Sequence, residues 1–346
     1  MKRNAGHRDA GLHRRVGADA KRRSTRRKLL IALGVSALAA PLASFAQQLQ
    51  KVYRIGVLTL APSPLLDAFL QGLREHGYVE GKNILIERRF TGNEVGKARA
   101  LAQELVALKV DVILASSSTF VEAARQATSE IPIVFWAHND PVGSGHIASL
   151  AHPGGNVTGV SQMATELNAK QLQLLKELLP PVTRVAVLSN PTTPSHIPAL
   201  KETEQAGRKL RLKLHLLEAS TLTQYELAFA AAANAGDQAL LLLTSPLSFA
   251  EHKRIAALAL ERRLPVMFGQ RVYVDAGGLI SYGPNLTEFS RRAADYVDRI
   301  LKGANPATMA VEQPTKFELV INMKTAKALG IKIPQSILIR VDKVIE

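Results

Sequence analysis

Short apolar segments and longer amphipathic segments alternate along the chain from Val52 onward. The first apolar segments, which we expect to be strands, are VYRIGVLTL, NILIERRF, DVILAS and IPIVFW. Between them, segments such as LLDAFLQGLREHG and EVGKARALAQELVALK place apolar residues three or four positions apart, which is the spacing of one helix face. Short apolar strands that alternate with helices are typical of a parallel sheet covered on both faces.

A second run of the same alternation begins after Pro180 and ends near Gly269, with expected strands RVAVLSN, KLHLLEA, QALLLLTS and LPVMFG. Beyond Gly269 the order changes to a strand (GGLISYG), a helix over 287–303, an extended piece and a strand-like end over 336–346. We therefore predict an α/β fold of two doubly wound, Rossmann-like lobes joined by hinge crossings. We expect residues 47–160 with about 284–310 in the first lobe, and residues 161–283 with about 311–346 in the second.

The first run of alternation ends in the segment 131–161. We expect a buried strand, a polar loop around His138 and Asp140, a short helix over 145–152 and a Pro-Gly-Gly turn before the apolar piece NVTGVS. This order indicates one wall of a ligand cleft followed by the first crossing between lobes. The expected hinge residues are Thr158 and Ser161 at this crossing, and Ser281 and Gly283 at a second one.

The net charge of +15 is concentrated near the N-terminus. Residues 1–46 carry eleven Lys and Arg and two Asp, whereas the rest of the chain carries 33 basic and 27 acidic residues. A strongly basic chain often binds nucleic acid or an anionic membrane. Because the body of this chain is only mildly basic, we expect no nucleic-acid partner.

The N-terminal charge forms part of an expected export signal. A basic segment that ends at Lys28 precedes an apolar run, Leu29–Leu42, and small residues at Ser44 and Ala46 mark a cleavage site after Ala46. The run is shorter than the roughly 20 residues that span a membrane. The pair Arg26–Arg27 leaves both the general secretory and the twin-arginine routes open. We expect the mature protein in the periplasm.

Polar side chains follow most of the expected strands. Ligands of doubly wound sheets bind beyond the carboxyl ends of the strands, at the point where the strand order switches. Ser117 to Thr119 open a helix whose N–H groups suit an anion, although simple N-capping is the alternative. Asp140 suits an ammonium group or orders the turn at Pro141, and Arg271 suits a carboxylate or is a surface charge. The expected ligand-binding residues are Ser63, Ser117, Ser118, Thr119, His138, Asp140, Asn190, Thr244, Arg271 and Tyr282.

The sequence carries little that indicates catalysis. It contains no cysteine, which excludes disulfides and thiolate sites. It contains neither G-x-S-x-G nor H-E-x-x-H, and no carboxylate pair stands out. We expect a protein that is not an enzyme and that needs no cofactor and no metal.

An ordered set of short motifs covers most of residues 52–346: FLQGLREHGYVEGKNILIERRF, DPVGSGHIASLAHPGGNVTGVS, AGGLISYG, AADYVDRILKGANPATMAVEQPTKFELVINMKTAKALGIKIP and RVDKVIE. In this set the chain resembles type 1 periplasmic binding proteins, in particular the substrate-binding proteins of ABC importers that include tryptophan- and aromatic-amino-acid-type binders. It departs from them at His138–Asn139, where a small residue is usual, and in RVDKVIE, where RADEVIE is usual. The first departure falls in the expected cleft and leaves the ligand open.

The resemblance implies a monomeric periplasmic receptor that captures a small ligand, an amino acid or a related molecule, between two closing lobes. Its partners would be that ligand and an ABC permease of the inner membrane. The main alternative is the ligand-sensing extracellular domain of a signalling system. A repressor with the same lobes would need a helix-turn-helix segment, and residues 1–46 show none.

Overall fold

A parallel five-stranded sheet organises the first part of the computed structural model, which describes residues 51–346. The expected export signal lies outside the described residues. The strands run in the spatial order β2-β1-β3-β4-β5, and all neighbouring pairs are parallel. The strands are β1 (Tyr53–Thr59), β2 (Ile84–Phe90), β3 (Val112–Ala115), β4 (Ile133–His138) and β5 (Val157–Ser161). As their apolar sequences predict, β3, β4 and β5 are buried along their whole length.

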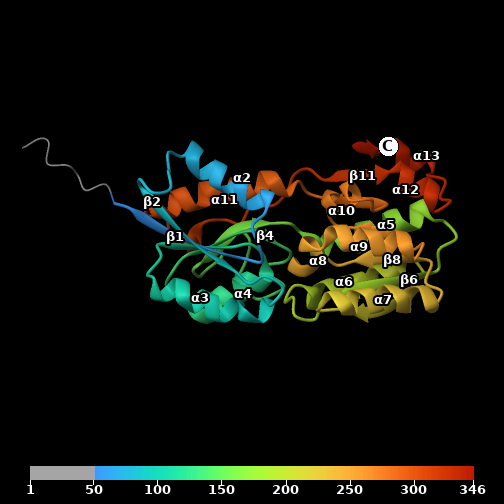
Figure 1. The fold of residues 1–346 in the computed structure, drawn as a ribbon, viewed down its shortest axis with the longest axis horizontal. Coiled ribbons are helices and arrows are strands. Elements are labelled where there is room, and N and C mark those ends of the chain that lie inside the picture. Colours follow the sequence, from blue (N-terminus) through green and yellow to red (C-terminus); the bar gives the residue numbers. More distant parts are fainter. Residues whose placement is uncertain (1–50) are drawn as a thin grey trace, which may run out of the picture. The chain divides into compact units, whose positions relative to one another are not determined.

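Helices cover both faces of this sheet. On one face α2 and α11 pack over a core that includes Phe69 and Trp136, and on the other α3 and α4 pack over a core that includes Phe120 and Phe135. Figure 1 shows α11, which comes from late in the chain, running beside α2. The helical segments of this sheet are α2 (Pro64–Glu75), η1 (Val95–Lys97), α3 (Ala98–Ala107), α4 (Ser118–Ala127), α11 (Leu286–Leu301) and η2 (Pro306–Thr308).

A second sheet of seven strands has the order β12-β11-β10-β9-β8-β6-β7. Its pairs are parallel except β10 with β11, which is antiparallel. The strands are β6 (Arg184–Ser189), β7 (Lys213–Glu218), β8 (Ala239–Leu242), β9 (Val266–Phe268), β10 (Ile280–Gly283), β11 (Glu318–Asn322) and β12 (Lys343–Ile345). The helices are α5 (Ala164–Leu178), α6 (His196–Lys209), α7 (Leu222–Asn234), α8 (Pro246–Ala250), α9 (His252–Glu261), α10 (Arg271–Asp275), α12 (Met323–Ala328) and α13 (Gln335–Leu338). The two sheets with their helices are the two lobes of an α/β fold.

The described chain crosses between the lobes three times: from β5 to α5, from β10 to α11, and from η2 to β11. The first and third crossings lie against each other, because Ser161 N donates to Glu312 O at 2.9 Å and Val160 pairs with Glu312 as a parallel bridge. Gly283 ends β10 where an added Cβ would lie 1.8 Å from Gly269 O. A side chain larger than hydrogen at position 283 would therefore push β10 away from the loop after β9.

Two expected elements are wrong. Residues 145–152 form turns and bends instead of a helix. Gly145 has φ +70°, and Ala148 N donates to Pro153 O, so the glycines and Pro153 direct the backbone into a loop. The expected terminal strand over 336–346 is mostly helix and turn, and only Lys343–Ile345 pairs with β11.

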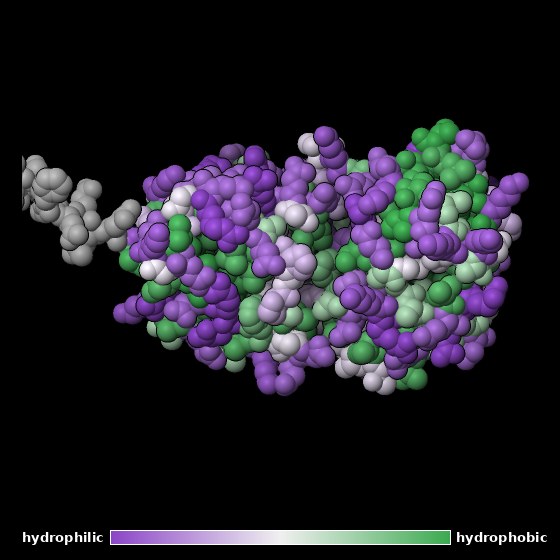
Figure 2. Space-filling model, turned by 45° about the horizontal axis from the view of Figure 1, so that its top comes forward, coloured by the Kyte–Doolittle hydropathy of each residue, from purple (hydrophilic) through white to green (hydrophobic). Residues whose placement is uncertain are grey.

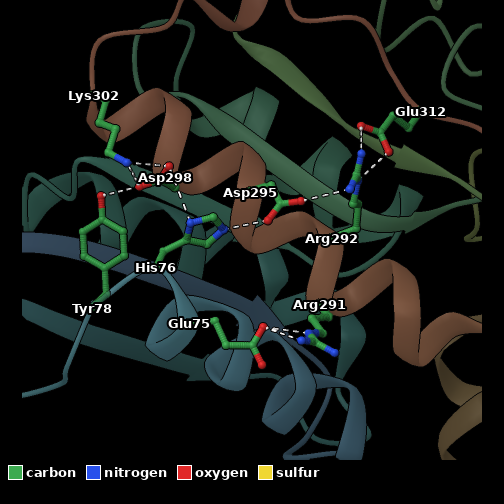
Figure 3. Close-up of polar contacts among 9 residues, drawn as sticks. All are labelled: Glu75, His76, Tyr78, Arg291, Arg292, Asp295, Asp298, Lys302 and Glu312. Atoms are coloured by element: carbon green, nitrogen blue, oxygen red, sulfur yellow. Dashed lines mark hydrogen bonds and ion pairs between the residues drawn. The ribbon is translucent and has the colours of Figure 1, made fainter.

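A cluster of charged side chains joins α2 to the returning helix α11 (Figure 3). His76 Nε2 lies 2.6 Å from Asp295 Oδ1, and Tyr78 Oη donates to Asp298 Oδ1 at 3.1 Å. Lys302 Nζ also contacts Asp298, which is 6% exposed. The buried Asp298 carboxylate is thus hydrogen-bonded and paired, as a buried charge requires.

The hydropathy of one face is mixed (Figure 2). Hydrophilic residues dominate over the first lobe, and a hydrophobic patch lies over the α12–α13 segment, where Ile339 is 74% exposed. Among residues 51–346, no helix has both the length and the apolar character needed to cross a membrane.

Candidate functional site

A cavity lies where the lobes and their crossings meet. Its empty volume is about 300 Å³, its opening to solvent included. Its wall combines the end of β4, the first crossing and α5 with the ends of β8 and β9 and the start of the second crossing. The lining residues are Asn139, Gln162, Ala164, Leu167, Asn168, Gln171, Leu242, Thr244, Gly269, Gln270 and Pro284. The cavity therefore has the position that the strand-end rule predicts.

Carboxamides dominate the wall and are held by one hydrogen-bond network. Gln162 Nε2 donates to Ala137 O at 2.8 Å and to Asn139 Oδ1 at 3.2 Å. Gln162 Oε1 in turn accepts from Gln270 Nε2 at 2.8 Å. Gln171 Nε2 donates to Tyr282 O at 2.8 Å. Because backbone carbonyls can only accept, they fix the orientation of Gln162 and Gln171, and Gln162 then fixes that of Gln270.

Three oxygens on this wall have no hydrogen-bond partner among the described residues: Gln171 Oε1, Gln270 Oε1 and Thr244 Oγ1. Gln171 and Gln270 are 3% and 5% exposed. A Cβ built on Gly269 would lie 3.3 Å from Thr244 Oγ1 and 3.6 Å from Gln171 Nε2, so Thr244 and Gln171 both lie beside Gly269, and Gln270 follows it in the chain. Buried polar atoms normally have partners, so three orphan oxygens on one cavity indicate a place for a polar ligand group.

None of the described residues that line the cavity is charged. Acidic side chains lie nearby: Glu166 is in the first turn of α5, and Asp140 is in the loop after β4. Partial desolvation raises the pKa of the Glu166 carboxyl, and the negative charges of Asp140 and Glu202 raise it further. The cavity is thus neutral, with negative charge close to one side of it.

Hydrogen bonds join the two lobes around the cavity. Ser118 Oγ lies 3.0 Å from Ser195 Oγ, and both residues are buried. Asn139 Nδ2 donates to Thr244 O at 3.3 Å. Since Ser118 and Asn139 follow strands of the first sheet and their partners belong to the second, the structure shows the lobes in contact with each other.

Two buried histidines support the Asn139 loop from behind. Asp140 N donates to His138 Nδ1 at 3.1 Å, so His138 carries its proton on Nε2. That Nε2 donates to His146 Nδ1 at 2.7 Å, and His146 Nε2 donates to Glu122 Oε2 at 2.9 Å. Burial lowers the pKa of both imidazoles, most strongly that of His138, so both are neutral at pH 7.

Several of the expected ligand residues have local partners. Ser63 Oγ caps α2 by accepting from Leu66 N, Asp140 Oδ1 accepts from Gly143 N, and Asn190 Oδ1 accepts from Thr192 N. His138 is fully buried, and Ser118 reaches Ser195. Ser117 Oγ and Thr119 Oγ1, at the start of α4, are buried and have no hydrogen-bond partner among the described residues.

The remaining expected residues lie in different places. Thr244 lines the cavity. Arg271 is half-buried and pairs with Asp275 on α10. The Tyr282 ring packs against Phe317, with centroids 5.8 Å apart, and its backbone oxygen holds Gln171. Ligand contact by the ten residues of the expected set stays a prediction.

The expected hinge residues lie at the first two crossings. Thr158 Oγ1 donates to Met309 O at 2.8 Å, and Ser161 Oγ accepts from Met163 N. Ser281 is 1% exposed on β10, and Gly283 ends that strand. A hinge role for these four residues stays a prediction.

Sequence reasoning missed most of the cavity wall. Gln270 follows the expected strand LPVMFG directly and precedes Arg271, which is the residue of this loop that we expected to bind the ligand. Asn168 and Gln171 lie on the expected helix 166–180, three positions apart, among the buried leucines of α5. Polar residues on an otherwise apolar helix face are the signal that could have identified them.

Comparison with known proteins adds a family. A family model described as ABC transporter substrate binding protein matches residues 61–345. A protein named tyrosine-binding protein, from Clostridioides difficile strain R20291, is 27% identical over 287 residues, which are 82% of each chain.

Solved structures share the fold. The crystal structure of a conserved domain protein from Vibrio cholerae has 29% identity and a TM-score of 0.80, and covers 85% of this chain and 100% of its own. An ABC domain in complex with L-Trp from Streptococcus pneumonia has 24% identity and a TM-score of 0.77, with 85% and 99% covered.

Proposed function

Since the chain belongs to the family of ABC transporter substrate-binding proteins, we propose that it captures an amino acid or a closely related molecule and delivers it to an inner-membrane permease. Members of this family bind small ligands, work with ABC permeases and are not enzymes. The relatives named for tyrosine and for an L-Trp complex support an amino acid as the ligand.

The single observation that carries the proposal is the cavity built from both lobes and two of their crossings, with unpartnered oxygens on its wall. A ligand in this cavity touches both lobes only when they are together. It therefore stabilises the closed arrangement over an open one, by as much as its affinity for the two arrangements differs. Closure about the crossings is the hinge motion that this geometry supports.

Location and assembly form part of the same proposal. The basic segment, apolar run and small residues before Gln47 support export with cleavage after Ala46. A periplasmic monomer that meets its permease in the closed form is consistent with the export signal and with the family. Of the expected partners, the permease would recognise surfaces of both lobes, so ligand-driven closure would control delivery.

Purification followed by ligand identification tests the proposal. The protein is purified from the periplasm, denatured, and the released small molecules are identified by mass spectrometry. L-Tyrosine, L-tryptophan and the other common amino acids are then tested by thermal shift on protein freed of ligand. Ligand at about 100 times its dissociation constant should stabilise the fold by roughly 2.7 kcal/mol. Absence of a released molecule together with an unchanged melting temperature for every amino acid would contradict it.

A further inference from the structure

We propose that the primary ammonium group of the ligand binds in this cavity to three neutral oxygens: Gln171 Oε1, Gln270 Oε1 and Thr244 Oγ1. The inference rests on the proposed function and names the ligand group that the cavity selects. A cation would thus be recognised without a carboxylate in direct contact.

The orientation of the carboxamides carries the first step. Turning the Gln270 amide over would place its oxygen against Gln162 Oε1, and turning Gln171 over would place its oxygen against Tyr282 O. Both changes bring two acceptors together without a proton between them. The network thus fixes both side chains with Oε1 unpaired. Neither carboxamide can turn over to present its NH₂ group in place of that oxygen.

The number of oxygens carries the second step. An ammonium group has three N–H donors and no acceptor. The wall offers two carbonyl oxygens and one hydroxyl oxygen without a partner among the described residues. A carboxylate in this position would meet two carbonyl oxygens, with no basic group among the described lining residues to offset the repulsion. A methyl group would leave all three buried oxygens unpaired.

The surrounding charge carries the third step, because it separates an ammonium from a neutral hydroxyl or amide. Asp140 lies close enough to Glu166 for its negative charge to add to the rise in the pKa of the Glu166 carboxyl that burial causes. Asn139, which lines the cavity, is next to Asp140 in the chain, and Ala164 and Leu167 lie on the same turn of α5 as Glu166. The negative potential on this side favours a positively charged occupant.

Matched pairs of probes test the ammonium group alone. L-Tyrosine is compared with 3-(4-hydroxyphenyl)propionate, and L-tryptophan with indole-3-propionate. The members of each pair share a carbon skeleton and a carboxylate and differ only in the amino group. Isothermal titration of the ligand-freed protein should show that the des-amino member of the bound pair binds at least about 100-fold more weakly, since several buried oxygens stay unpaired.

Substitution then locates the group. Thr244→Val removes the hydroxyl oxygen at nearly constant volume and leaves the backbone carbonyl that Asn139 and His196 contact. It should reduce the ratio of the two affinities by about tenfold, and Gln171→Met should reduce it at least as much. The matched control is Thr193→Val, which also removes a buried hydroxyl without a partner among the described residues but lies outside the cavity lining. It should leave the ratio unchanged.

The outcomes separate the inference from the proposed function. Equal binding of both members of a pair overturns the ammonium site and leaves the receptor function intact. If both Thr244→Val and Gln171→Met keep the full selectivity for the amino group, the ammonium group does not bind at these oxygens. Binding of no probe by the folded protein overturns the inference and the amino-acid ligand together.

Discussion

Three buried histidines hold the loops that meet at the boundary between the lobes. His138 and His146 lie behind the Asn139 loop. On the other lobe, His196 Nδ1 accepts from Asn190 N at 2.9 Å, so its Nε2 carries the proton and donates to Thr244 O at 3.1 Å. Each of these rings uses one nitrogen as acceptor, which requires the neutral form. Protonation would break one hydrogen bond in each loop.

The stability of the protein should therefore fall in mild acid. Burial lowers the pKa of His196 to about 4, whereas the ordinary value is 6.5. Between pH 6.5 and about pH 4, His196 is protonated in the unfolded chain but not in the folded chain. The free energy of unfolding therefore decreases as the pH falls through this interval. For His196 alone the loss between pH 7 and pH 5 is about 2 kcal/mol. Urea unfolding at the two pH values measures it.

Substitution of His196 provides the control for this prediction. His196→Asn keeps an acceptor near Asn190 N but does not titrate, so the difference in unfolding free energy between pH 7 and pH 5 should shrink by about 2 kcal/mol. Ile197→Ala, at an exposed neighbouring position, should show the same pH difference as the unchanged protein. Equal pH differences for all three proteins would exclude His196 as a source of the effect.

The sequence predicts the place of the cavity better than its chemistry. Loops after strands could be located from the apolar pattern alone, and Thr244 is in such a loop. Gln171 could not be recognised in this way, since its role depends on Tyr282 O, 111 positions later in the chain. Arg271 illustrates the converse: its charge suggested a ligand contact, but Asp275 lies one helical turn away and pairs with it.

At the scale of elements, the long helices and buried strands were predictable because their periodicity is strong. A helix over 145–152 was wrongly expected because the apolar residues of this segment have helical spacing, whereas Gly145 and Pro153 favour a loop. The return of about residues 284–310 to the first lobe was expected, but the contact of α11 with α2 was harder to derive, because helices separated by some 220 positions carry no sequence signal of their contact.

The contact between α2 and α11 depends on a glycine. A Cβ on Gly72 would lie 2.7 Å from Arg291 O and 2.8 Å from Ala294 Cβ. Gly72→Ala should improve the helix propensity of α2 by about 1 kcal/mol but force the helices apart at a cost of about 1–3 kcal/mol. We expect a lower melting temperature, measured by circular dichroism.

Gly96→Ala is the matched comparison, because nothing lies within 4 Å of its Cβ position. It should leave the melting temperature unchanged or slightly higher. If Gly72→Ala instead proves as stable as the unchanged protein, α2 and α11 do not pack as closely as the structure indicates.

At the scale of the whole molecule, the direct contact between Ser118 and Ser195 allows the lobes to be locked. The chain contains no cysteine, so a double variant, Ser118→Cys with Ser195→Cys, has a single possible disulfide. The two Oγ atoms are 3.0 Å apart, which is close enough for small side-chain rotations to bring the sulfurs together. Oxidation should fix the lobes against each other.

The locked protein should no longer exchange ligand. Oxidised without ligand, it should bind none, and oxidised with a radiolabelled ligand, it should retain the label through dialysis. Reduction should reverse both effects, and each single cysteine variant should behave like the unchanged protein. Free exchange in the oxidised double variant would show that the ligand enters without separation of the lobes.

The number of crossings has a consequence for how closure can be observed. The described chain crosses an odd number of times, so Tyr53 of β1 belongs to one lobe and Ile345 of β12 to the other. A donor fluorophore near the first of these residues and an acceptor near the last would report closure as a change in energy transfer, without any label near the ligand. Because the described chain crosses more than once, no single cut in the gene releases an intact lobe: α11 of the first lobe is encoded after most of the second.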